Sequence, residues 1–188
     1  MGTIQSNDTP REWCESAPHW ERHAQTIRTM FAPLTSALIE DAGIAPGQNV
    51  LDVAGGPGEP SLTIAEVVGS SGLVTCTDAI AEMVSAAERE AHRRRLTNIK
   101  FHQCAADSLP FDSNSFDAVV SRLGVMLFPD PIAALREMLR VTKPNGEVAL
   151  VVWARSDANP FFHLVSAVIS LRRNTCCRSR RARRVSLC

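Results

Sequence analysis

A glycine-rich turn between two apolar segments is the feature that most constrains the fold of this sequence. The run Val50–Val53 leads into Gly55-Gly56-Pro57-Gly58, and a second apolar segment, Ser61–Val68, follows. This order indicates a strand, a tight turn and a helix, and the glycines let a ligand approach the backbone closely. In open α/β sheets, ligands bind beyond the carboxyl ends of the strands, beside a helix N-terminus that favours negative charge. We therefore expect a carboxylate or phosphate to dock at this turn.

Further β-rich runs alternate with segments of helical periodicity. The runs are Asn49–Val53, Leu73–Thr77, Ile99–Cys104, Phe116–Ser121 and Glu147–Trp153. Apolar residues at helical spacing start at Ile80, and Pro131 suits the first position of a later helix. Alternating strands and helices predict an α/β fold, a Rossmann-like, doubly wound, mostly parallel sheet with helices on both faces.

The sequence pattern divides the chain into three parts. Residues 1–42 form a predicted helical lead-in, with an apolar helix expected over residues 17–42. Residues 43–157 hold the predicted sheet and its ligand site. Residues 158–188 are expected to form a helix through Ile169 and then an atypical tail rich in Arg, Cys and Ser.

The spacing of the glycines separates two kinds of cofactor. A dinucleotide fingerprint, G-x-G-x-x-G, counted from Gly56 would need a third glycine where the chain has Ser61. Asp52, four residues before Gly56, instead resembles the acid in the D-x-G-x-G-x-G signature of class I S-adenosylmethionine-dependent methyltransferases. Ala54 replaces the first glycine of that signature. Taken alone, the loop is also compatible with an ordinary strand-to-helix turn.

Two further acids follow later strands. Asp78 closes the second strand, where a carboxylate can accept both ribose hydroxyls of an adenosine; the alternative is an acid at the N-terminus of the next helix. Asp107 follows the third strand, and the resemblance implies that it accepts a hydrogen bond from the adenine amino group, with Ala106 beside the ring. By the same resemblance, Ile80 and Met83 line the adenine pocket.

The resemblance extends over roughly residues 45–155 and is strongest to the group that includes the ubiquinone and menaquinone C-methyltransferases. It implies S-adenosyl-L-methionine as the cofactor, a small-molecule methyl acceptor and no metal. Asp117 is expected to be structural. The implied cofactor contacts are Asp52, Ala54, Gly55, Gly56, Gly58, Asp78, Ala79, Ile80, Met83, Ala106, Asp107, Ser108 and Ser121.

No residue is assigned to catalysis. The sulfonium methyl of such a cofactor is already electrophilic, so transfer by in-line displacement depends mainly on positioning and on exclusion of water. His19 or His23 is a conceivable general base, and a solvated helix surface is the alternative for both. Arg122 either reaches a substrate or pairs with Asp130 or Glu137.

The charge distribution changes abruptly near the carboxyl end. Residues 158–188 hold seven Arg and no acid, a charge of +7, whereas residues 1–157 carry −7. Members of the resembled family continue with another helix and then an antiparallel strand pair, and we expect this chain to lack the strand pair. Three explanations of the tail stay open: a frameshifted or truncated product, which we favour, a disordered extension, or a basic arm for nucleic acid. A frameshifted or truncated product would leave the fifth strand at the edge of the sheet, and the enzyme could then be inactive.

Other classes of function are less well supported. A nicotinamide-dependent oxidoreductase is disfavoured by the missing third glycine and by the absence of any Tyr. A non-catalytic adenosine-cofactor-binding protein and an RNA-associating module are the remaining alternatives, although we do not expect nucleic acid as a partner. The chain has no apolar run of about 18 residues and no signal-peptide pattern, so a cytoplasmic protein without a membrane segment is expected. The six cysteines lack metal-ligand spacing and are expected to be reduced.

Overall fold

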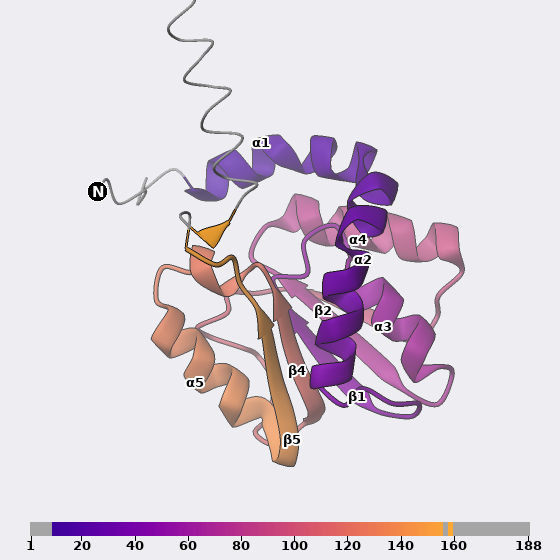
Figure 1. Cartoon of the computed structure of the whole chain (residues 1–188), viewed down its shortest axis with the longest axis vertical. Coiled ribbons are helices and arrows are strands. Elements are labelled where there is room, and N and C mark those ends of the chain that lie inside the picture. The colour runs from indigo at the N-terminus through magenta and orange to yellow at the C-terminus, as the bar shows by residue number, and fades with distance from the viewer. Residues whose placement is uncertain (1–8, 156–157, 160–188) are drawn as a thin grey trace, which may run out of the picture. The chain divides into compact units, whose positions relative to one another are not determined.

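The apolar runs form one five-stranded sheet. The computed structural model describes residues 9–155 and 158–159, and Figure 1 shows the arrangement of the elements. In chain order these are α1 (Thr9–Arg22), α2 (Ala24–Asp41), β1 (Asn49–Val53), α3 (Ser61–Val68), β2 (Leu73–Asp78), α4 (Ala81–Arg94), β3 (Ile99–Gln103), β4 (Phe116–Arg122), the 3-10 turn η1 (Val125–Leu127), α5 (Pro131–Val141) and β5 (Thr142–Val151). Each predicted strand is present.

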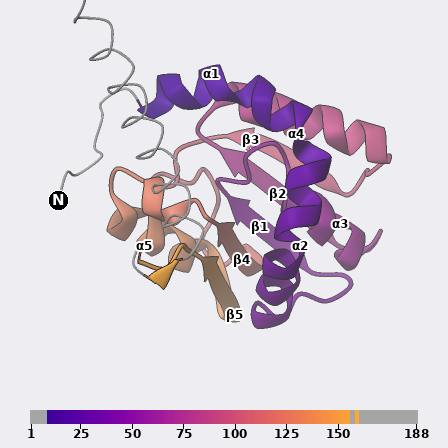
Figure 2. The same cartoon turned by 45° about the horizontal axis from the view of Figure 1, so that its top comes forward.

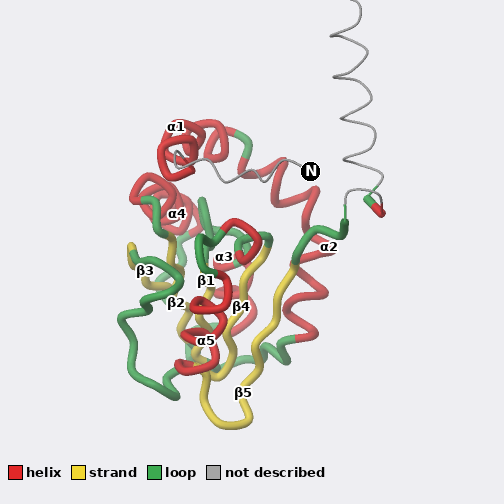
Figure 3. Tube along the Cα trace, turned by 90° about the vertical axis from the view of Figure 1, so that its left-hand side faces the viewer, coloured by secondary structure: helices red, strands yellow, loops and turns green. Residues whose placement is uncertain are grey.

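The sheet is parallel throughout, in the order β3-β2-β1-β4-β5. The chain builds outward from β1 to β3 on one side and then crosses to β4 and β5 on the other. This reversal next to β1 is where open α/β sheets bind ligands. β5 lies at one edge (Figure 3), and no antiparallel strand pair is found in the described part of the chain. The predicted doubly wound fold is confirmed.

Two apolar clusters hold helices on opposite faces of the sheet. Leu38 of α2 and Ile64 of α3 pack in the cluster that contains Val50, whereas Met138 of α5 packs in the cluster that contains Leu51. The neighbours Val50 and Leu51 belong to different clusters because successive strand side chains point to opposite faces. Figures 1 and 2 show α5 on one side of the sheet and α2 and α3 on the other.

The lead-in consists of two helices where the sequence predicted one over residues 17–42. α1 begins at Thr9, and the helical path is broken at His23, which adopts φ −103° and ψ 11°. Only Thr35 and Leu38 of α2 are fully buried, and both lie in its second half. The second half of the lead-in is therefore the part that covers the sheet.

β5 starts at Thr142, five residues before the predicted Glu147. The Pro-Gly turn expected to precede the strand lies inside it, as an irregularity in the pairing with β4. Gly146 makes this possible, because a Cβ at that position would lie 2.6 Å from the carbonyl oxygen of Asp117 on β4. Asn145 beside it adopts the left-handed region, at φ 65°.

The chain separates into two compact units after Val152. The second unit comprises residues 153–188, of which the structure describes residues 153–155 and 158–159. The predicted helix through Ile169, the Arg-rich tail and its cysteines lie outside the described residues. Among the described helices, none combines the length and apolar character needed to cross a membrane.

Candidate functional site

Asp52 links the central strand to the helix after the glycine-rich turn. Its carboxylate is fully buried at the end of β1, and its Oδ2 accepts hydrogen bonds from the backbone N–H of Ser61, at 3.1 Å, and from the Ser61 hydroxyl. Oδ1 has no protein partner. Burial raises the pKa of Asp52 from 3.8 to about 6, against the opposing effects of Ser61 and of the Arg122 charge. The carboxyl is thus held at an energetic cost beside the predicted ligand site.

The turn has one position that is packed and one that is open. A Cβ at Gly55 would lie 2.7 Å from Sγ of Cys76 and 2.8 Å from Oδ2 of Asp52, so this glycine is required by packing. Gly56 has φ +55°, and a Cβ at this position would have no atom within 4 Å. The structure therefore has open space beside the Gly56 backbone, on the side where a Cβ would lie.

The two ends of the turn are also strained or tightly packed. Ala54, which replaces the family's first glycine, adopts φ 60° in the left-handed region. Gly58 has φ +113°, and a Cβ there would lie 2.7 Å from Cδ1 of Leu62. Only glycine satisfies both conditions at position 58, which explains the second half of the motif.

Asp78 lies against the turn. Its Oδ2 accepts a hydrogen bond from the Gly56 N–H at 3.0 Å, and its Oδ1 accepts one from the Ile80 N–H at 2.9 Å. Burial raises the pKa of Asp78, while the hydrogen bonds from these backbone groups act in the opposite direction. The carboxylate therefore joins the ends of β1 and β2 and also bonds the residue before α4, so both sequence interpretations of Asp78 fit its geometry.

The loops after β2 and β3 are tied together beside Asp78. The Gln103 side chain donates to the carbonyl oxygen of Ala79 at 3.2 Å, and the Cys104 N–H donates to the Asp78 carbonyl at 3.0 Å. Of the predicted adenine contacts, Met83 is buried at 3% exposure, Ile80 and Ala106 are half-buried, and Ala79, Asp107 and Ser108 are exposed. Asp107 and Ser108 thus present polar groups to solvent, whereas Met83 belongs to the core.

Ser121 lies at the end of β4, on the other side of β1. It is fully buried, and its hydroxyl has no protein partner. A Cβ at Gly124 would lie 2.8 Å from this hydroxyl and 2.7 Å from Cβ of Ala54, so Ser121 and the turn both border the same glycine. The predicted residues of β1, β2 and β4 therefore lie together at the carboxyl ends of these parallel strands.

Arg122 has a structural role that sequence reasoning missed. Nη1 donates to the Thr35 hydroxyl of α2 at 2.7 Å, Nη2 donates to the Glu59 carbonyl at 2.9 Å, and the guanidinium lies 5.4 Å from the ring centre of Phe31. Burial lowers the pKa of this guanidinium. Thr35 is 87 residues away in sequence, so no local pattern could have identified this contact.

Arg122 bonds Thr35 and Glu59 rather than Asp130 or Glu137, the pairing that the sequence left open beside a contact with substrate. Asp130 caps α5 by accepting from the Ala133 N–H, and Glu137 pairs with Arg140 at 2.6 Å. Both acids already have local partners one turn away on their own helix, which explains why neither pairs with Arg122.

Asp117 lies at the opposite end of the sheet and is structural, as predicted. Its Oδ2 accepts from the Asn49 N–H at 2.8 Å, and its Oδ1 pairs with Nζ of Lys143 at 2.7 Å. His19 and His23 are exposed, one in the last turn of α1 and the other at the break before α2. Neither has an observed contact that marks it as a base.

Comparison with known proteins identifies one family. The sequence model of the family described as "ubiE/COQ5 methyltransferase family" matches residues 35–166 of this chain. An uncharacterised protein of Mycobacterium tuberculosis is 37% identical over 131 residues, 70% of this chain and 46% of that protein. The ubiquinone/menaquinone biosynthesis C-methyltransferase UbiE of Cellvibrio japonicus is 40% identical over 118 residues, 62% of this chain and 47% of that enzyme. The chain thus spans about half the length of these relatives.

Solved structures show the same fold. The crystal structure of a SAM-dependent methyltransferase from Aquifex aeolicus superimposes with a TM-score of 0.61 at 26% identity, covering 67% of this chain and 68% of that one.

Proposed function

The chain belongs to the ubiE/COQ5 methyltransferase family, and from this premise we propose that it transfers a methyl group from S-adenosylmethionine to a small-molecule acceptor. S-adenosylmethionine is the cofactor of this fold and family. We place its site at the carboxyl ends of β1, β2 and β4, with the loops after β2 and β3 on the adenine side.

One observation supports this placement above the others, the hydrogen bond from the Gly56 N–H to Asp78. It brings a carboxylate that can accept ribose hydroxyls next to a glycine with open space around it. The Ser121 hydroxyl and Oδ1 of Asp52 are both buried near the carboxyl ends of these strands, and neither atom has a protein partner. Buried polar atoms are normally hydrogen-bonded, so these atoms fit a site that a polar ligand completes.

In this proposal, different residues contact different parts of the cofactor. Asp78 would accept the ribose hydroxyls, Asp107 the adenine amino group, and the turn around Gly56 would face the amino-acid end, where the N-terminus of α3 favours a carboxylate. When bound, the cofactor supplies an electrophilic sulfonium methyl. The protein's contribution is to orient the acceptor in line with that methyl and to exclude water.

Calorimetric titration with S-adenosylmethionine and S-adenosylhomocysteine tests the site. We expect wild-type binding to be weakened at least about tenfold by Asp78→Asn, since truncating a buried charged hydrogen bond costs about 1.5–3 kcal/mol. Asp107→Asn should weaken binding less, because this side chain is exposed. Asp112→Asn, an exposed acid in the same β3–β4 connection, is the matched control and should bind as the wild type does. A folded wild-type protein that binds neither compound would refute the proposal.

A further inference from the structure

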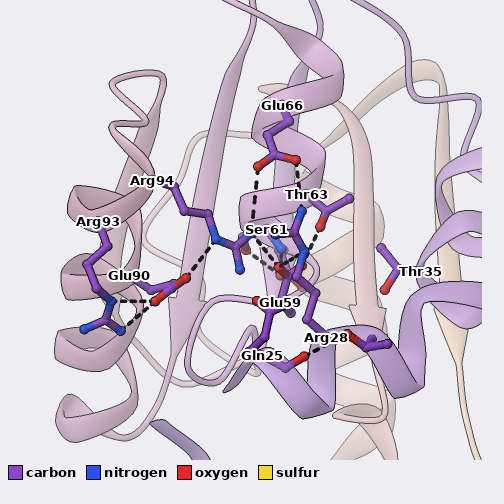
Figure 4. A network of polar contacts seen from close by, with 12 residues as sticks. Gln25, Arg28, Thr35, Glu59, Ser61, Thr63, Glu66, Glu90, Arg93 and Arg94 are labelled. Atoms are coloured by element: carbon purple, nitrogen blue, oxygen red, sulfur yellow. Dashed lines mark hydrogen bonds and ion pairs between the residues drawn. The ribbon is translucent and has the colours of Figure 1, made fainter. Parts of the chain in front are cut away.

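A network of charged side chains surrounds Glu59, the residue directly after Gly58. The Glu59 side chain is only 8% exposed. Its Oε2 accepts a hydrogen bond from the Thr63 hydroxyl of α3 at 2.7 Å. Figure 4 shows two arginines from different helices reaching the same carboxylate. Glu59 is therefore a buried acid at the junction of the glycine-rich turn and α3.

The first arginine belongs to α4. Nη1 of Arg94 lies 2.7 Å from Oε1 of Glu59, as a charge pair outside hydrogen-bond alignment, and the Arg94 side chain is 11% exposed. Nε of Arg94 also donates to Glu90 of α4 at 2.9 Å. Arg94 is thus held in place by its own helix while it neutralises Glu59.

The second arginine belongs to α2. Nε of Arg28 lies 3.4 Å from Oε1 of Glu59, and its Nη2 lies 3.2 Å from Glu66 of α3. Glu66 is 43% exposed and contacts the same two arginines, with Arg94 at 3.9 Å. The network therefore has one buried acid, Glu59, and one solvated acid, Glu66, on the same pair of cations.

A separate contact also joins Glu59 to α2. Arg122 donates to the Glu59 backbone carbonyl at 2.9 Å while it donates to Thr35 of α2 at 2.7 Å. The side chain and the backbone of one residue are thus both connected to α2, through Arg28 and Arg122. Because Glu59 adjoins Gly58, a displacement of the turn changes both connections.

We propose that Glu59 is a positioning residue that couples binding of S-adenosylmethionine at the glycine-rich turn to the seating of α2 on the domain. This inference relies on the proposed function for the identity of the ligand. Loss of the Glu59 charge removes the buried acid that both arginines share and leaves Arg28 with Glu66 and Arg94 with Glu90, so the connection of the turn to α2 and α4 is weakened. Loss of the Glu66 charge leaves both arginines paired with Glu59.

The test compares Glu59→Gln with Glu66→Gln by titration with S-adenosylhomocysteine. Gln at position 59 keeps an oxygen for Thr63, removes the charge and places an amide NH2 where Oε1 faces the two arginines. Coupling between two parts of a protein typically changes affinity by 5- to 150-fold, and we expect Glu59→Gln to weaken binding about tenfold. Glu66→Gln should change it less than about twofold, as an exposed pair contributes little.

Hydrogen exchange of the α2 amides distinguishes coupling from a general loss of structure. In the wild-type protein, saturation with S-adenosylhomocysteine should slow exchange both at the turn and in α2. In Glu59→Gln at saturation, the turn should be protected and α2 should not. Arg28→Met, at a 34% exposed side chain, removes the connection from the Glu59 side chain to α2 and leaves the Arg122 contact in place; it should give the same pattern if Glu59→Gln fails to fold. Wild-type affinity and a wild-type α2 response in Glu59→Gln would overturn the proposal.

Failure of the proposed function would give a different result. If the folded wild-type protein binds no S-adenosylhomocysteine, exchange is compared without ligand. Glu59→Gln should then speed exchange in both the turn and α2, whereas Glu66→Gln should not. Faster exchange confined to the turn would refute the link to α2 independently of any ligand.

Discussion

Ala54 stands in a backbone conformation that favours glycine. Its φ of 60° lies in the left-handed region, where a Cβ costs roughly 1–2 kcal/mol. We expect Ala54→Gly to raise the free energy of unfolding by up to about 1 kcal/mol, because the relief of strain exceeds the added freedom of the unfolded chain. Urea unfolding measures the change.

The same substitution elsewhere gives a control of opposite sign. Ala37 is exposed on α2, and Ala37→Gly should destabilise the protein by about 1 kcal/mol, as glycine does inside helices. A loss of stability in Ala54→Gly similar to that in Ala37→Gly would show that the turn is not strained at Ala54.

Asp52 makes stability depend on pH. Its pKa of about 6 in the folded protein exceeds the ordinary 3.8, so the folded state binds the proton more tightly than the unfolded state. Stability therefore falls as pH rises from about 4 to about 6 and is then level, with a total penalty on the order of 3 kcal/mol. Asp52→Asn can keep the Ser61 hydrogen bonds without the charge. It should exceed the wild type in stability most at pH 8, by at most about 3 kcal/mol.

Urea unfolding of both proteins between pH 4 and pH 8 checks this expectation. The difference in unfolding free energy should shrink as the pH is lowered through 6, where the wild-type carboxyl becomes protonated in the folded state. Asp41→Asn, at the exposed end of α2, controls for the loss of one acid from the chain. A difference that is constant over this range would contradict a buried, ionisable Asp52.

At the scale of elements, the sequence predicts the bounds of a helix or strand correctly where those bounds depend on neighbouring residues in the chain. β1 has the predicted bounds, because its apolar run and glycine-rich turn are both local. The start of β5 was missed since Gly146 brings the chain within close range of the Asp117 carbonyl, a contact set by β4 rather than by the Pro-Gly sequence. The break at His23 was missed because apolar residues continue on both sides of it.

The residues of the candidate site also fall into two groups, those that the sequence identifies and those that only the packing of helices on the sheet brings together. The family motif singles out Asp52 and Gly56, and the end of the second strand singles out Asp78; in the structure Gly56 donates a hydrogen bond to Asp78, and Gly55 beside it packs against Asp52. The arginines that surround Glu59 are 31 and 35 residues away from it, on α2 and α4. Charged residues on helix surfaces are common, so no spacing rule singles out this pair. Such contacts depend on how helices pack on the sheet.

At the scale of the whole molecule, cofactor binding should stabilise the folded chain. The proposed ligand contacts β1, β2 and β4 at once, and it can do so only when the sheet is formed. A ligand that binds only the folded state adds about 2.7 kcal/mol at a concentration of 100 times Kd. For a chain of this size each kcal/mol corresponds to about 2–4 °C, so S-adenosylhomocysteine should raise Tm by about 5–10 °C.

Thermal unfolding at several ligand concentrations measures this shift, which should grow with the logarithm of concentration above Kd. Asp78→Asn at the same concentration should give a smaller shift, because its affinity is expected to be lower. Adenosine, which lacks the amino-acid end, should also stabilise less if the turn around Gly56 contributes to binding. A calorimetric signal without any shift in Tm would mean that the compound binds the folded and the unfolded chain equally well, which would contradict a site that forms only when β1, β2 and β4 are assembled.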